Sequence, residues 1–194
     1  MSEPPISRFP VGTLDELPDD LRRPIAAIAD KTGFVPNVFL ALAHRPDELR
    51  AFMAYHDALM ERAPADDGSG LSKAEREMIV VATSGANDCL YCVVAHGAIV
   101  RIRAKRPLLA DQLATNPHSA DLTERERHIV RFALRVANDA AAVTDHDLTH
   151  MRDLGFTDDE IWDIGAITAF FAMSNRMASF AGIRPNPEFY TLGR

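Results

Sequence analysis

Residues 71–92 read LSKAEREMIVVATSGANDCLYC, and this stretch predicts a helical fold. Ser72 stands where a helix N-cap is expected, and Glu75 follows three residues later, which is the capping-box pattern of a helix start. Apolar side chains then recur at the spacing that is typical of a buried helix face. The sequence Gly-Ala-Asn-Asp indicates a break, after which we expect Asn87 or Asp88 to cap a second helix that carries the cysteines.

The same pattern returns further along the chain, where residues 122–143 read LTERERHIVRFALRVANDAAAV and align with 71–92 without gaps. Both stretches share the leading Leu, the capping box and an Ala-Asn-Asp sequence. Duplication of a helix–break–helix unit explains this match, and convergence on good helix ends is the alternative. Ala140 and Val143 stand at the positions of the two cysteines, so the second copy is expected to be scaffold.

Helical spacing extends over most of the remaining chain. Apolar residues recur every three or four positions from 14 to 31, and a last helix is expected from Asp158 to Ala181, where Gly182 ends it. We expect Trp162 and the Phe170-Phe171 pair to lie in the core. Runs of alternating Val and Ile, which would indicate strands, are missing.

The sequence therefore predicts one all-α domain over residues 1–194. Within it we expect an extended segment over 1–13, a loop over 64–70, a redox helix pair over 71–104 and a second, cysteine-free half over 122–182.

Composition excludes several classes of function. The chain has 194 residues, is 47% hydrophobic and carries a net charge of −7. An acidic chain without a basic stripe is not expected to bind nucleic acid or anionic membranes. No apolar run approaches the roughly 18 residues of a spanning helix. The N-terminus, MSEPPISRFP, lacks the apolar core of a secretory signal, so we expect a cytoplasmic protein.

Cys89 and Cys92 are the only cysteines of the chain, and their spacing points to thiol chemistry. A Cys-x-x-Cys pair in a reducing compartment is typically catalytic or metal-bound. Zinc needs four ligands, and only His96 stands nearby as a third, so we expect no metal. The alternative is that both cysteines are buried small apolar residues.

Two features are expected to activate a thiol here. The N-terminus of the second helix favours an anion, because its free N–H groups and dipole carry partial positive charge. His96 lies one turn after Cys92, on the same helix face, where it can take a proton. Glu77 is the candidate carboxylate that orients His96, since it lies near the apolar face of the preceding helix, where a charge needs a partner.

Two further residues are expected near the thiols. Tyr91 lies between the cysteines and is interpreted as a packing residue or as part of the rim of a pocket. His56, in the stretch AYHDALM, is a second possible pocket residue. This stretch lies in the half of the chain that carries the resemblance given below.

The pattern Glu77, eleven residues, Cys89-x-x-Cys92-x-x-x-His96 resembles the core of the alkyl hydroperoxidase D and carboxymuconolactone decarboxylase superfamily. The stretches GFVPNVFLALAHRPDELRAF (33–52) and NRMASFAGIRPNPEF (175–189) are similar to its peroxidase-related subfamily. The resemblance implies an all-helical fold with two related halves and a homo-oligomer such as a trimer, hexamer or dimer.

The resemblance also implies an antioxidant enzyme that reduces a hydroperoxide without a bound cofactor. Cys92 would attack the peroxide, Cys89 would resolve the sulfenic acid as a disulfide, and His96 with Glu77 would relay protons. A dihydrolipoyl-type dithiol protein would reduce the disulfide. Tyr91 departs from the pattern of alkyl hydroperoxidase D, which has a histidine there, and this puts a high peroxidase rate in doubt.

Two alternatives stay open beside the enzyme. One is a redox-sensing or interaction protein on the same scaffold, which would form the disulfide without turnover. The other is a carboxymuconolactone decarboxylase-like activity, although those relatives do not rely on a Cys-x-x-Cys pair.

Overall fold

The computed structural model describes residues 5–63 and 69–194, and across these residues the chain forms helices and no strand. The all-α prediction is therefore confirmed. The α-helices are α1 (Asp19–Thr32), α2 (Asn37–Leu42), α3 (Pro46–Met60), α4 (Lys73–Ala86), α5 (Leu90–Ala104), α6 (Leu109–Thr115), α7 (Glu124–Asp139), α8 (Asp145–Asp153) and α9 (Asp158–Ala181). Short 3-10 turns lie at Leu14–Glu16, Ala140–Ala142 and Pro187–Tyr190.

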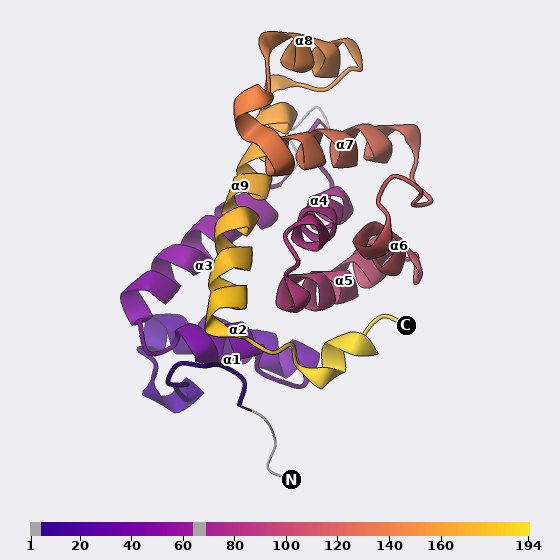
Figure 1. The fold of residues 1–194 in the computed structure, drawn as a ribbon. Helices are drawn as coiled ribbons and strands as arrows, with labels where there is room; N and C mark the ends of the chain where they lie inside the picture. The colour runs from indigo at the N-terminus through magenta and orange to yellow at the C-terminus, as the bar shows by residue number, and fades with distance from the viewer. Residues whose placement is uncertain (1–4, 64–68) are drawn as a thin grey trace.

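Helix α4 is the centre of the bundle. It packs against α5, α6, α7 and α9, and Figure 1 shows these helices arranged around it. Every side chain from Glu75 to Ser84 is buried. A helix that is covered on all sides carries apolar residues around its whole circumference, which is why the apolar run MIVVA suits this position.

The predicted helix starts are confirmed where a capping box was expected. The Ser72 hydroxyl accepts from the Glu75 backbone N–H at 3.2 Å, and the Ser72 N–H donates to the Glu75 carboxylate at 2.7 Å. Thr123 and Glu126 make the same reciprocal pair at the start of α7. These contacts join residues three positions apart, so the local sequence is sufficient to specify them.

The predicted cap of the cysteine helix is wrong. Neither Asn87 nor Asp88 is the N-cap of α5; Cys89 occupies that position. Asp88 adopts a left-handed conformation with φ of 53°, which reverses the chain between α4 and α5. The Cys89 N–H donates to the Ser84 carbonyl oxygen at 3.0 Å, so the turn is closed by the backbone.

The two aligned stretches, 71–92 and 122–143, correspond in their first helix and differ afterwards. Helix α4 ends at Ala86, before the Asn-Asp pair, whereas α7 continues through Asn138 to Asp139. A 3-10 turn and the short helix α8 follow α7, in place of a long second helix such as α5.

Three further predictions need correction or restriction. The stretch 14–31 is not one helix, because Pro18 separates the 3-10 turn from α1. Trp162 is 74% exposed, since the other described helices leave its side of α9 uncovered, while Phe170 and Phe171 are buried as expected. Of the predicted loop over 64–70, residues 64–68 lie outside the described residues, as do residues 1–4 of the predicted extended segment.

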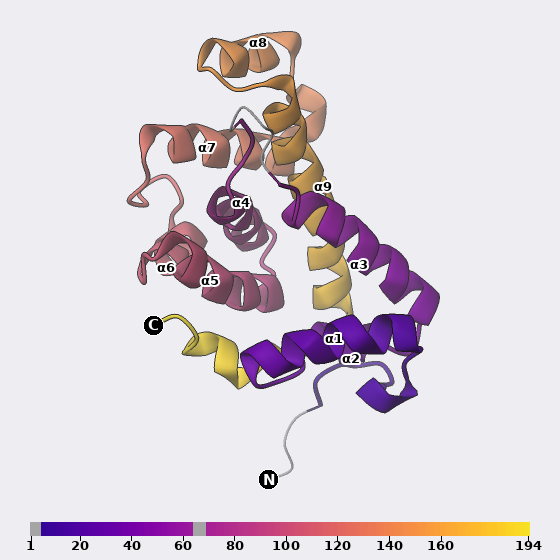
Figure 2. The ribbon, with the colours of Figure 1, turned by 180° about the vertical axis from the view of Figure 1, so that it is seen from behind.

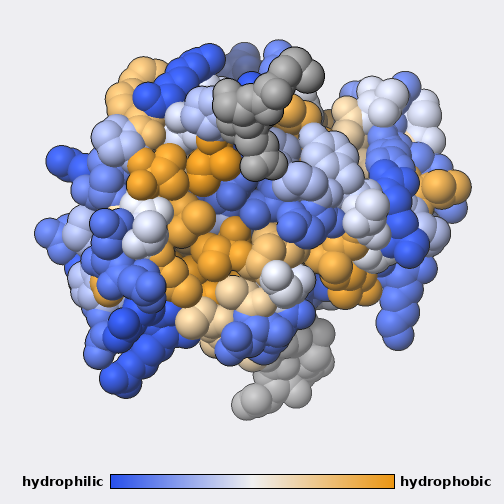
Figure 3. All heavy atoms as spheres, turned by 90° about the horizontal axis from the view of Figure 1, so that it is seen from below, coloured by the Kyte–Doolittle hydropathy of each residue, from blue (hydrophilic) through white to orange (hydrophobic). Residues whose placement is uncertain are grey.

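Near its N-terminus the described chain pairs with the segment that follows α9. The Arg8 N–H donates to the Ala181 carbonyl at 2.8 Å, and the Arg184 N–H donates to the Ile6 carbonyl at 3.0 Å. Figure 2 shows α1 and α2 crossing the same end of the molecule, close to the C-terminal segment. The view from below in Figure 3 shows apolar side chains gathered in the middle of this face, with hydrophilic ones around them.

No helix among the described residues is both long enough and apolar enough to span a membrane.

Candidate functional site

The two cysteines lie at the start of α5, as free thiols inside the protein. Cys89 is 1% exposed and Cys92 is 2% exposed. Both belong to an apolar cluster that also contains Ala95, Ala178 and Phe189. Their position at the first turn of a helix, next to the end of α9, combines helix-terminal N–H groups with shielding from water.

His96 and Glu77 are brought together by the packing of α5 on α4. The Nδ1 atom of His96 lies 2.7 Å from Oε2 of Glu77, and only 13% and 5% of the two side chains are exposed. The ring of Phe171 meets the His96 ring edge-on at 4.8 Å between centroids, which restricts its rotation. A carboxylate at Nδ1 holds the imidazole in one orientation and leaves its other nitrogen for proton transfer.

The two thiols have opposite acidities. Hydrogen bonds lower the pKa of Cys89 to about 6, against the opposing effect of burial. The largest contribution comes from the Cys92 thiol, and smaller ones come from the Cys92 backbone N–H and the side chains of Ser179 and Asn175. The hydrogen bond between the two thiols, together with burial, raises the pKa of Cys92. The first proton therefore leaves from Cys89, and Cys92 remains a thiol that donates to it.

Asn175 is a site residue that we did not predict from the sequence. Its amide donates to the Ser84 hydroxyl at 2.9 Å and accepts from the Asn87 amide at 3.0 Å. It is 1% exposed and contributes to the hydrogen bonding of both thiols. Asn175 opens the stretch NRMASF that carries part of the resemblance, and this was the available signal.

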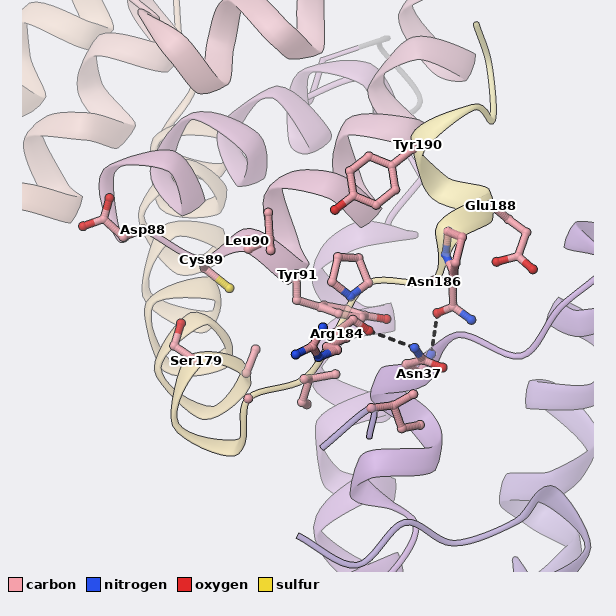
Figure 4. A pocket seen from close by; sticks show the side chains of 16 residues that line it. Asn37, Asp88, Cys89, Leu90, Tyr91, Ser179, Arg184, Asn186, Glu188 and Tyr190 are labelled. Carbon is pink, nitrogen blue, oxygen red and sulfur yellow. Dashed lines mark hydrogen bonds between the residues drawn. The ribbon is translucent and has the colours of Figure 1, made fainter. Parts of the chain in front are cut away.

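A cavity of about 800 Å³ opens beside Cys89. Its lining includes Cys89, Leu90 and Tyr91 from α5, Ser179 from α9 and the segment 182–188. Figure 4 shows the Cys89 sulfur turned toward this space. Cys92, His96 and Glu77 do not line the cavity, so within the described part of the chain they lie behind Cys89.

One wall of the cavity joins distant parts of the sequence. The Asn37 N–H donates to the Asn186 side-chain oxygen at 2.8 Å, and the Asn37 amide donates to the Arg184 carbonyl at 2.8 Å. These bonds tie the FVPN and RPNPEF motifs to each other, as the dashed lines in Figure 4 show. The two motifs of the resemblance thus build one side of the site.

Tyr91 is in the cavity wall, and His56 is not. Tyr91 is buried, its hydroxyl accepts from the Val38 N–H at 3.2 Å, and burial raises its pKa, so it packs α5 against α2 as a neutral phenol. His56 approaches His96 from α3, with 6.4 Å between ring centroids, and its Nδ1 lies 3.0 Å from the Asp57 carboxylate.

No group of three or more metal-ligating side chains gathers among the described residues. The groups that the structure brings together are a cysteine facing the cavity, a second cysteine behind it, and a histidine–carboxylate pair one turn further along α5. Such a set can form and break a disulfide between the two cysteines and can move a proton to and from Cys92.

Comparison with known proteins identifies the family. A model of the carboxymuconolactone decarboxylase family matches residues 46–107. No curated protein matches the chain. Among solved structures, an uncharacterized peroxidase-related protein from Ralstonia eutropha JMP134, described as an alkylhydroperoxidase AhpD core, is 59% identical. The match covers 99% of this chain and 98% of that one, with a TM-score of 0.94.

Two other structures extend the comparison. An uncharacterized peroxidase-related protein from Silicibacter sp. TM1040 is 38% identical over 100% of both chains, with a TM-score of 0.85. The debrominase Bmp8 is 18% identical over 97% of this chain and 95% of its own, with a TM-score of 0.74, and this likeness concerns the fold alone. The chain belongs to the carboxymuconolactone decarboxylase family, among its alkylhydroperoxidase AhpD-like, peroxidase-related proteins.

Proposed function

We propose that the protein is a thiol-dependent hydroperoxidase that cycles between the Cys89–Cys92 dithiol and its disulfide. Its substrates are an organic hydroperoxide and an external dithiol, and it needs no bound cofactor. The observation that carries the proposal is the buried thiol pair at the start of α5 with the Glu77–His96 contact behind it. Membership of the peroxidase-related group supports the same class of reaction.

In the first step Cys89 attacks the peroxide. The resemblance assigned this role to Cys92, but the cavity, the position at the helix N-cap and the lowered pKa all favour Cys89. The Cys89 thiolate takes the terminal oxygen of ROOH and becomes a sulfenic acid. The O–O bond breaks, and the alkoxide leaves as ROH after it takes a proton from water.

In the second step Cys92 resolves the sulfenic acid. Its raised pKa keeps it a thiol, so it needs a base in order to attack. His96 lies one turn later on the same face of α5 and is held by Glu77. His96 takes the proton from Cys92 and returns it to the departing hydroxide, so that the disulfide and one water molecule are formed.

In the third step an external dithiol restores the protein. Its thiolate attacks Cys89, the sulfur on the cavity side, and Cys92 leaves and is reprotonated by His96. The second thiol of the reductant then displaces Cys89 and becomes a disulfide itself. A dihydrolipoyl-type carrier has the required chemistry, and we propose such a protein as the reductant.

The cycle is tested by peroxide consumption with dihydrolipoamide, comparing wild type with Cys89→Ser and Cys92→Ser. We expect turnover in wild type and its loss in both variants. Equal rates in all three proteins would exclude the dithiol cycle. Disulfide formation by peroxide without turnover would instead identify a redox sensor.

The order of attack is tested by trapping the sulfenic acid with dimedone in the two single-cysteine variants. We expect Cys92→Ser, which keeps Cys89, to be labelled by one equivalent of cumene hydroperoxide. Labelling confined to Cys89→Ser would show that Cys92 attacks, as the resemblance implies.

We also propose that the protein is cytoplasmic and forms a homo-oligomer. A reducing compartment keeps the two thiols available for the cycle. The outward side of α9 supports the assembly, because it presents exposed apolar side chains at helical spacing: Trp162, Met173, Met177 and Phe180. Light scattering behind a sizing column measures the mass, and Trp162→Glu is expected to lower it.

A further inference from the structure

The cavity beside Cys89 contains one positive side chain, and it has no ion-pair partner among the described residues. Arg184 lines the cavity, and none of the ion pairs among the described residues includes its guanidinium. Most other arginines here are paired, such as Arg76 with Asp163 and Arg194 with Asp111. In the view of Figure 4 the guanidinium of Arg184 points toward the side on which Cys89 lies.

The backbone of Arg184 is held firmly, which gives its side chain a defined origin. Its N–H donates to the Ile6 carbonyl, and its carbonyl accepts from the Asn37 amide at 2.8 Å. The following residues are anchored as well, because the Asn186 amide donates to the Val35 carbonyl at 2.9 Å. Two carboxylates, Asp88 and Glu188, also line the cavity, but Figure 4 places them at its two margins.

The remaining lining has the character of a site for a small organic molecule. Leu90, Tyr91, Ala178, Ile183 and Pro185 supply apolar surface beside the polar groups. A volume of about 800 Å³ lies within the roughly 300–1,000 Å³ that is usual for ligand pockets, where a few polar groups orient a mainly apolar ligand. A guanidinium forms two parallel hydrogen bonds with a carboxylate, so a small organic acid fits a cavity that combines Arg184 with apolar walls.

We propose that this cavity binds a small organic acid, whose carboxylate is held by Arg184 while its reactive end meets the Cys89 sulfur. The inference rests on the proposed function for the identity of the reactive end, which is then a hydroperoxide group. The substrate class is a hydroperoxide of an aliphatic or aromatic carboxylic acid. Arg184 is a binding residue that selects the acid over its neutral analogues.

The binding site is tested without turnover by alkylation of Cys89. Iodoacetate is an anion and iodoacetamide is its neutral isostere, and the thiolate displaces iodide from each in the same way. We expect the rate ratio of iodoacetate to iodoacetamide to fall about three- to fivefold in Arg184→Gln, the range of one partly exposed ion pair. High salt should reduce the wild-type ratio as well, since it screens the guanidinium.

Arg131→Gln is the matched control. Arg131 is an exposed arginine of α7 that does not line the cavity, so its loss should leave the ratio unchanged. Peptide mass spectrometry identifies the alkylated cysteine. An equal ratio in wild type and Arg184→Gln, or initial modification of Cys92, would overturn the inference.

A second arm measures selectivity in turnover, with linoleic acid hydroperoxide against its methyl ester. Arg184→Gln should raise KM for the acid about threefold and leave KM for the ester unchanged. If neither compound is consumed by wild type, the proposed function fails, and the alkylation ratio still decides the binding site. If both are consumed but Arg184→Gln alters neither the alkylation ratio nor KM for the acid, the acid site fails and the dithiol cycle stands.

Discussion

Replacement of Cys92 by Ala should raise the pKa of Cys89. The hydrogen bond from the Cys92 thiol is the largest influence that holds the pKa of Cys89 at about 6. A hydrogen bond to a charged group contributes roughly 1.5–3 kcal/mol, and one pKa unit corresponds to about 1.4 kcal/mol. The loss of this donor should therefore move the pKa of Cys89 up by about one to two units, toward that of an ordinary thiol.

The direction of the change in the pKa of Cys89 follows from the protonation state that the Cys92 donor stabilises. Cys92 donates to the thiolate of Cys89, so its removal destabilises the anion and delays ionisation to higher pH. At pH 7 the thiolate fraction should fall from about 90% to between about 10% and 50%. The rate of alkylation by iodoacetamide at this pH should fall about two- to tenfold with it, because the thiolate is the reacting species.

The assay is the pH dependence of the alkylation rate, together with thiolate absorbance at 240 nm, which reports Cys89 alone once Cys92 is replaced. Cys92→Ser is the matched control, since a hydroxyl can still donate to the thiolate, and its midpoint should stay near that of wild type. A midpoint near 6 in Cys92→Ala would refute the role given to this hydrogen bond. A wild-type midpoint at 8 or above would refute the acidity of Cys89 itself.

Three other changes test the site and the fold. His96→Ala removes a positioned base and should slow disulfide closure after sulfenic acid formation by about 100-fold or more. His150 is exposed, so the control variant His150→Ala should close the disulfide at the wild-type rate. Rapid-quench alkylation measures both rates. Asp163→Ala leaves Arg76, which is 1% exposed, without its ion-pair partner, at an expected cost of about 3–5 kcal/mol in the free energy of unfolding. A fall in Tm of less than roughly 6 °C would contradict this. Ser72→Ala removes one half of a capping box and should cost about 1 kcal/mol, which is roughly 2–4 °C in Tm by calorimetry.

The helices were predictable because their signals are local. Ser72 with Glu75 and Thr123 with Glu126 cap their helices through contacts three residues apart, and Gly182 ends α9 in the left-handed conformation that suits glycine. The cap of α5 was not predictable in this way. Asn and Asp are the usual capping residues, but the reversal at Asp88 moves the helix start to Cys89.

Burial was less predictable than helicity, because it depends on which neighbours cover a helix face. Trp162 is apolar and exposed, while Arg76 is charged and buried. Neither local sequence distinguishes its residue from the usual buried tryptophan or exposed arginine. Arg76 is stabilised inside by Asp163 and by the carbonyl oxygens of Leu59 and Leu71, which come from three other segments.

By itself the sequence determined the all-helical fold and the Cys89–Cys92 pair, and it singled out Glu77 and His96 as the residues behind that pair through spacing and resemblance. Only the tertiary structure decided which of the two thiols faces the cavity and which is the more acidic. The cavity that reaches Cys89 is closed by bonds between Asn37 and the segment 184–186, which no local signal connects. Acidity and access depend on these long-range neighbours, because a thiolate is stabilised by the donors around it in space.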